Sequence, residues 1–228
     1  MRVLPLCVAG CAVAVVAAGN TTVSALGQRH LSVLQRFLAR GDQPTVEYCA
    51  VRHLEAQNTR FGASAWMDAR TEYDRAGGFR FEVLAEGGSA YIRKKVLRAA
   101  LEGEQKLWAA REPERASLTP DNYTFQDAVA IVDGLAALGV KPRRKDILLV
   151  DGVIYVQSDD GELKRIEGRL SKAPSFWTRS VEIRRQYERI LGVRVPVLIE
   201  SVAQVRVAGR STFRMTYRYE SINGRPVI

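Results

Sequence analysis

The chain has 228 residues, of which 46% are hydrophobic and 26% are charged, and its formal net charge at pH 7 is +9. This length is ample for one hydrophobic core, so a single domain is the simplest organisation. The basic residues form no stripe with interleaved aromatic side chains, which argues against nucleic-acid binding.

The N-terminal segment has the pattern of a signal peptide. Arg2 precedes an uncharged apolar run, Val3 to Ala18, and Val23-Ser24-Ala25 supplies small residues for cleavage. The run is shorter than the roughly 20 residues of a membrane-spanning helix. We therefore expect residues 1–25 to be a cleaved signal peptide and residues 26–228 to form one domain of an exported, periplasmic protein. An uncleaved anchor is the alternative.

The three cysteines constrain the exported chain further. Cys7 and Cys11 lie in the signal segment, so Cys49 stands alone and no intramolecular disulfide is expected. Val8-Ala9-Gly10 before Cys11 resembles a lipidation box. A lipid anchor is not expected, because most of the apolar run would follow the cut.

Apolar residues at helical spacing predict an amphipathic helix over residues 28–40. A second helix is expected from its N-cap, Ser89, to about Ala110. Between them, alternating apolar and polar residues indicate a meander. Its strands are expected near 46–57, 63–73 and 79–85.

The second half of the chain reads mainly as β-strands. Residues 122–140 are compatible with strand or helix by period alone, and the turn signal at Asp133-Gly134 favours a strand, a turn and another strand. In the last third, Phe213, Met215, Tyr217 and Tyr219 alternate with polar residues, as expected of a half-buried strand. The pattern predicts an α+β fold, mainly antiparallel β, in which helices cover one side of the sheet.

Residue types needed for catalysis or metal binding are sparse. The two histidines, His30 and His53, have no metal-ligand spacing around them. Cys49 and His53 share one face of a strand, but their Cα atoms would lie about 13 Å apart, too far for a nucleophile and its base. No nucleophile elbow or phosphate-binding loop occurs. We expect no catalytic residues, no metal and no cofactor.

Aromatic residues are the best candidates for a binding site. Those on predicted strands and helices are candidates to line the concave side of the sheet, with ordinary core packing as the alternative for each. The cavity-lining candidates are Trp66, Phe79, Phe81, Trp108, Tyr155, Phe213 and Tyr217. A Pro-containing turn places Phe176 and Trp177 beside Lys172 and Arg179, which predicts contact with a membrane or a partner. The aromatic pair would otherwise open the next strand.

One hairpin carries a family resemblance. The segments Asp151 to Val156, Asp159 to Leu163 and Arg165 to Gly168 form an apolar strand, an acidic-Gly turn and a strand with basic residues. This arrangement resembles the lipoprotein-carrier superfamily of bacterial envelopes, which includes LolA, LolB and the RseB-type regulators. The resemblance implies a curved sheet that forms an unclosed half-barrel with helices packed on its concave side. No ligand-contact position of that family is matched residue by residue.

The resemblance also implies a function. In those relatives the cavity accepts acyl chains, so we expect a non-enzymatic binder or carrier of a lipid, lipoprotein or other amphiphile. Expected partners are acyl chains, with an anionic membrane surface or another envelope protein as further partners, and no nucleic acid. The alternative is a periplasmic regulatory or scaffold protein on the same fold. A carrier predicts an apolar cavity of several hundred Å³.

Overall fold

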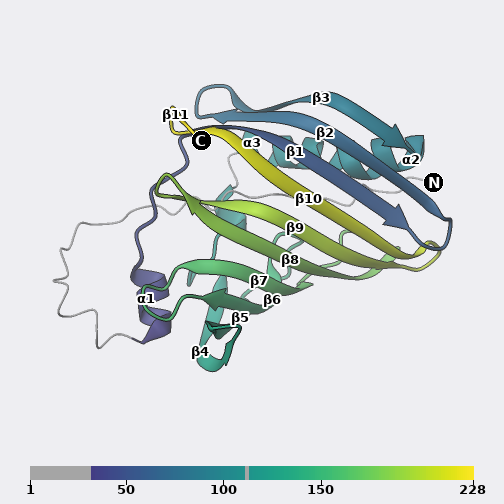
Figure 1. Cartoon of the computed structure of the whole chain (residues 1–228). Coiled ribbons are helices and arrows are strands. Elements are labelled where there is room, and N and C mark those ends of the chain that lie inside the picture. Colours follow the sequence, from purple (N-terminus) through teal and green to yellow (C-terminus); the bar gives the residue numbers. More distant parts are fainter. Residues whose placement is uncertain (1–31, 111–112) are drawn as a thin grey trace.

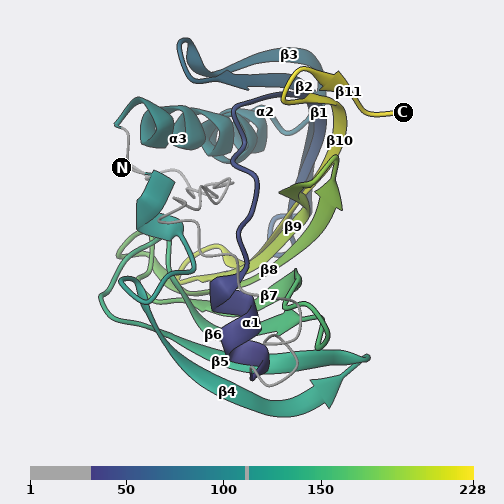
Figure 2. The ribbon, with the colours of Figure 1, turned by 90° about the vertical axis from the view of Figure 1, so that its left-hand side faces the viewer.

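The computed structural model describes residues 32–110 and 113–228, whose strands form one 11-stranded sheet. The sheet order is β3-β2-β1-β10-β9-β8-β7-β6-β5-β4, with β11 paired to β10, and every pairing is antiparallel. Since β3 and β4 end this order, the sheet is not closed. The predicted fold class, an α+β half-barrel with helices on the concave side, is confirmed (Figures 1 and 2).

The elements follow one another as a helix, a meander, a helical segment and a long run of strands. In chain order they are α1 (Val33–Ala39), β1 (Glu47–Asn58), β2 (Ala63–Asp74), β3 (Gly78–Gly88), α2 (Ala90–Ile92), η2 (Arg93–Leu97), α3 (Arg98–Ala109), η3 (Pro113–Ala116), β4 (Tyr123–Val132), β5 (Leu135–Pro142), β6 (Val150–Val156), β7 (Leu163–Leu170), β8 (Thr178–Ile190), β9 (Val193–Val205), β10 (Gly209–Ile222) and β11 (Arg225–Pro226).

The predicted elements agree closely with these bounds. The first three predicted strands are β1, β2 and β3, and the predicted turn at Asp133-Gly134, where both residues have positive φ, joins β4 to β5. The first helix is shorter than predicted. Its expected start, the predicted signal peptide and Cys11, where lipidation is not expected, all lie outside the described residues.

Local sequence explains where the helices begin. The Ser32 side chain accepts a hydrogen bond from the Gln35 N–H, and the Gln35 side chain accepts one from the Ser32 N–H, which is a capping box. Ser89 caps the second helical segment by accepting from the Ile92 N–H. This segment runs through a π-helical turn, η2, before α3.

The helical segments cover different parts of the concave face (Figure 2). η2 packs on β1, β2 and β3, and α3 packs on β3, whereas α1 packs on β4, where the Phe37 and Phe125 rings lie 6.0 Å apart. Arg36 and Arg40 of the α1 region also donate hydrogen bonds to carbonyls of the turn between β6 and β7. Strands β8 to β10 therefore lie between the two helical segments.

Candidate functional site

Strand register aligns one row of inward-facing side chains across the concave face. The row takes one residue from each strand from β2 to β5 in sheet order, and all of its members are buried. These are Met67, Leu54, Met215, Ile199, Arg185, Ile166, Ile154 and Leu138. The row is a continuous apolar track in which Arg185, on β8, is the one charged side chain.

Polar side chains gather around Arg185 in the middle of the concave face. Tyr187, two residues along β8, is 3% exposed, and Ser201, on neighbouring β9, is 4% exposed. Among the described residues, neither hydroxyl group has a hydrogen-bond partner. A buried polar group without a partner costs about 1–3 kcal/mol. This part of the core therefore offers unused hydrogen-bonding groups inside an apolar surface.

A buried ion pair joins the sheet to the helix beside this region. Arg52, on β1, lies 2.6 Å from the Glu104 carboxylate on α3, and its guanidinium also donates to the Tyr48 hydroxyl at 2.7 Å. The guanidinium lies over the Tyr217 ring, 4.6 Å from its centroid, and over the Phe79 ring at 5.0 Å. Both charged side chains are almost fully buried.

Burial and charge set the protonation states in this cluster. Burial alone would lower the pKa of Arg52, but the Glu104 carboxylate beside it raises that pKa well above its ordinary value. Burial raises the pKa of Tyr48, Tyr217 and Tyr219. The three phenols therefore stay protonated and can act as hydrogen-bond donors.

A small void lies on the concave side of the sheet, beside α3. A void of about 10 Å³ lies against Arg52, Glu104, Tyr217 and Tyr219, which is room for one water. A groove of about 910 Å³ lies on the outer face beside β7 and β8, and side chains of both signs line it.

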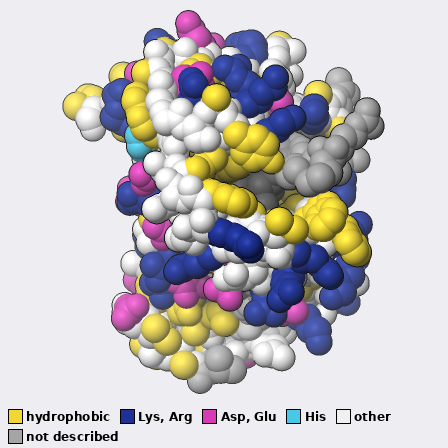
Figure 3. Space-filling view, turned by 90° about the vertical axis from the view of Figure 1, so that its right-hand side faces the viewer, with side chains coloured by type: hydrophobic (Ala, Val, Ile, Leu, Met, Phe, Trp, Pro, Cys, Tyr) yellow, Lys and Arg dark blue, Asp and Glu magenta, His cyan; other side chains and the backbone are white. Residues whose placement is uncertain are grey.

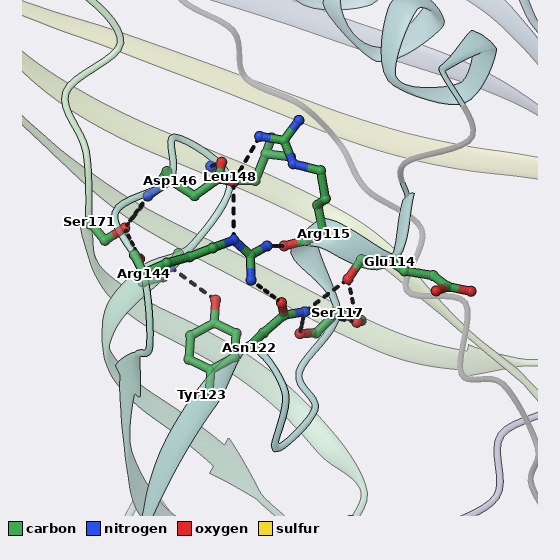
Figure 4. A network of polar contacts seen from close by, with 10 residues as sticks. Glu114, Arg115, Ser117, Asn122, Tyr123, Arg144, Asp146, Leu148 and Ser171 are labelled. Atoms are coloured by element: carbon green, nitrogen blue, oxygen red, sulfur yellow. Dashed lines mark hydrogen bonds and ion pairs between the residues drawn. The ribbon is translucent and has the colours of Figure 1, made fainter.

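A polar network fixes one wall of that outer groove (Figure 4). Arg115 lies 2.8 Å from Asp146, and the Asp146 N–H donates to the Ser171 hydroxyl at 3.0 Å. Asn122 and Arg144 continue the network toward η3. Burial favours the neutral form of Asp146, but hydrogen bonds from Arg115 and the Leu148 N–H hold its pKa below the ordinary value. The network anchors the start of the loop that follows β7.

The structure separates the predicted cavity residues into two groups. Five lie in the concave core or pack against it. They are Phe79, Phe81, Trp108, Phe213 and Tyr217. Trp66 and Tyr155 lie on the outer face instead. Trp66 is 40% exposed and stacks on His53, and the Tyr155 ring lies under Arg165, with 4.1 Å between guanidinium carbon and centroid. These two residues do not line the concavity.

The predicted contact loop lies at one end of the sheet. Lys172, Phe176, Trp177 and Arg179 are all exposed, and the Phe176 and Trp177 rings meet edge to face at 5.7 Å. Phe176 also lies under Arg206, which belongs to the β9–β10 turn. The structure thus adds a neighbouring loop to the predicted group.

Cys49 and His53 share the outer face of β1 but have separate partners. The Cys49 thiol donates to Glu220 at 3.2 Å and contacts Arg70, while His53 Nδ1 lies 2.6 Å from Asp68. Burial raises the pKa of the Cys49 thiol, which disfavours the reactive thiolate.

Two absences within the described part of the chain bear on other kinds of site. In residues 32–110 and 113–228, no cluster of His, Cys, Asp or Glu side chains could hold a metal ion. Over the same residues, no helix is both long and apolar enough to cross a membrane.

Comparison with known proteins gives structural neighbours only. No family model matches the sequence, and no curated protein matches it. A domain from Vibrio parahaemolyticus, whose description refers to outer membrane lipoprotein sorting, has 11% identity and a TM-score of 0.40, with 83% of this chain and 91% of that chain covered. A LolA superfamily protein from Nitrosomonas europaea has 9% identity and a TM-score of 0.40, with coverages of 86% and 93%. A LolA superfamily member is thus among the solved structures similar to this chain.

Proposed function

We propose that this protein is an exported, non-enzymatic binder or carrier of an amphiphile, whose apolar part lies along the concave face of the half-barrel. One observation carries the proposal. An apolar track crosses the concave face, and at its centre are one buried cation, Arg185, and two hydroxyls without partners among the described residues, on Tyr187 and Ser201. An apolar track with a polar centre fits a ligand with both an acyl chain and a polar or anionic head.

The contact between α3 and β1 sets a condition on binding beneath this helix. The void of about 10 Å³ beside Arg52 and Glu104 is too small for an acyl chain, so a ligand that lies there needs α3 to move away from the sheet. The buried pair of Arg52 and Glu104 joins α3 to β1, so it would oppose that movement. Binding beneath α3 is therefore expected to involve a conformational change.

The test is native mass spectrometry of the protein purified from a bacterial envelope, with lipid extraction of the same sample. We expect a co-purifying acyl-chain species in near-stoichiometric amount. A lipid-free protein that also fails to take up dansyl-undecanoic acid would contradict the proposal. That result would favour the regulatory or scaffold alternative.

Two adjacent arginines supply a matched pair of variants. Arg184 and Arg185 are neighbours on β8, but Arg184 lies on the outer face, where it pairs with Glu167 at 2.6 Å. Arg185→Met should reduce the retained acyl species, because it removes the only cation of the concave track. Arg184→Met should leave retention unchanged. Equal effects of the two substitutions would argue against a head-group site on the concave face.

A further inference from the structure

Three loops meet at the end of the sheet where β8 begins. We call this end the tip, defined as residues 58–62, 171–179 and 206–210. Asn58 Nδ2 donates to the Ala208 carbonyl at 2.8 Å, which ties the β1–β2 turn to the β9–β10 turn. The Arg206 N–H donates to the Trp177 carbonyl at 2.8 Å, which ties in the third loop. The base of that loop is anchored through Ser171 (Figure 4).

Large apolar side chains of the tip point into solvent. Phe176 is 74% exposed, Phe61 64%, Val207 56% and Trp177 41%. Figure 3, which views the molecule from this end, shows hydrophobic side chains gathered on the surface, with Lys and Arg side chains beside them. Hydrophobic groups gathered on a surface and rimmed by polar ones mark an interaction site.

The charge of the tip is of one sign. Its loops carry the exposed cations Arg60, Lys172, Arg179, Arg206 and Arg210, and they contain no Asp or Glu. On the outer face of the sheet, by contrast, arginines stand beside carboxylates, as Arg184 does beside Glu167 and Arg214 beside Glu55. Within the described part of the chain, no tip cation takes part in an ion pair. The tip therefore presents uncompensated positive charge around an apolar centre.

We propose that the tip docks on an anionic lipid bilayer. Aromatic side chains favour the head-group region of a membrane, where Trp can keep its N–H hydrated while its ring contacts acyl chains. Lys and Arg beside them are attracted to anionic head groups. Because the three loops are tied together by hydrogen bonds, the apolar and basic groups reach the bilayer as one preformed surface. This proposal goes beyond ligand binding in the concavity and concerns a different part of the molecule.

The test is co-sedimentation of the full chain with vesicles of phosphatidylcholine, with or without phosphatidylglycerol. We expect binding to the anionic vesicles that weakens as salt is raised. The triple variant Lys172→Gln/Arg179→Gln/Arg206→Gln should bind anionic vesicles more weakly by about fivefold for each cation removed. The double variant Phe176→Ser/Trp177→Ser should also bind weakly. Circular dichroism checks that each variant is folded.

Matched controls use residues outside the tip. Ile131, on edge strand β4, is as exposed as Phe61, and Arg214 and Arg218 are exposed outer-face arginines. Ile131→Ser and Arg214→Gln/Arg218→Gln should bind vesicles as the unmodified chain does. All variants keep the same N-terminus, so its apolar segment contributes equally to each.

Fluorescence identifies which side chain enters the bilayer. Anionic vesicles should shift the tryptophan emission to shorter wavelengths, and Trp177→Phe should abolish the shift. The proposal is overturned if tip and control variants bind alike, if phosphatidylcholine alone binds equally well, or if no vesicle binds. The last outcome would leave a protein partner as the occupant of the tip. Vesicle binding and retention of co-purified lipid are measured separately, so each proposal can fail without the other.

Discussion

The guanidinium of Arg52 lies 2.6 Å from the Glu104 carboxylate, although the two residues belong to opposite layers of the fold, the sheet and the helix that covers it. Both side chains are withdrawn from water, so the attraction between them must offset the cost of desolvating two charges. The pair specifies where α3 sits on the sheet. It also places a polar contact at the boundary between α3 and the sheet.

We expect Arg52→Met to lower the free energy of unfolding by about 3–5 kcal/mol, because it leaves the Glu104 carboxylate buried without its partner. Arg52→Met/Glu104→Leu should recover much of this loss, since both charges are then replaced by apolar groups. Urea denaturation followed by circular dichroism measures all variants.

The outer-face pair of Arg214 and Glu55 gives the control for this cycle. Both side chains are about half exposed, so Arg214→Met should cost no more than about 1 kcal/mol. If Arg52→Met costs as little as Arg214→Met, the buried pair does not hold α3 in place.

The hydroxyl of Tyr187 should affect ligand binding more than stability. It has no partner among the described residues, so Tyr187→Phe removes an unsatisfied buried group and should leave the unfolding free energy unchanged or slightly higher. In contrast, the Tyr219 hydroxyl donates to the Pro196 carbonyl at 2.9 Å, and Tyr219→Phe should cost about 0.5–1.5 kcal/mol. Retention of co-purified lipid should fall in Tyr187→Phe. A loss of stability in that variant instead would mean that its hydroxyl is already satisfied.

Strand parity explains both what the sequence predicted and what it missed. Phe213 and Met215 are buried as predicted, because successive side chains of a strand point to opposite faces of the sheet. The same rule places Trp66 on the face of its neighbours two residues away, Asp68 and Ser64, and so outside the concavity. Aromatic character and a place on a strand do not settle which face a side chain occupies, whereas parity does. Tyr155 lies between buried Ile154 and Val156, so parity places it on the outer face as well.

Other features of the site are only partly signalled by the sequence. Arg52 shares parity with Ala50 and Leu54, so a cation on the apolar face of β1 could have been noticed. The ion pair between Arg52 and Glu104 could not have been predicted, because only the packing of α3 on the sheet brings these residues together. The position of Arg185 in the apolar track also depends on the register between strands. That track continues onto β1 only because β1 pairs with β10, a strand far from it in the sequence.

Acid should weaken the network around Asp146. Its pKa in the folded protein is depressed, so its contribution to stability is present above the unfolded pKa, about 3.9, and is lost as the pH falls through the folded pKa. Asp146→Asn should cost about 1–3 kcal/mol at neutral pH, and the difference from the unmodified chain should shrink below about pH 4. Urea denaturation as a function of pH measures this.

Arg115→Met tests whether the neighbouring cation stabilises the ionised form of Asp146. This variant keeps the carboxylate but removes its nearest cation, so the acid-induced loss of stability should begin at a higher pH. A pH profile identical to that of the unmodified chain would show that Arg115 does not stabilise the ionised form.

Gly161 should be needed because α1 packs directly on the turn between β6 and β7. Its φ is +72°, and an added Cβ would lie 2.5 Å from the Phe37 backbone nitrogen, which cannot move unless α1 moves. Gly134 has a similar φ, +77°, but an added Cβ there would meet no atom within 4 Å. Both Gly→Ala substitutions carry a backbone cost of about 1–2 kcal/mol. Gly161→Ala should lose clearly more stability than Gly134→Ala and should expose Arg36 and Arg40 of the α1 region to trypsin, whereas equal losses and equal cleavage would mean that α1 is not held by this turn.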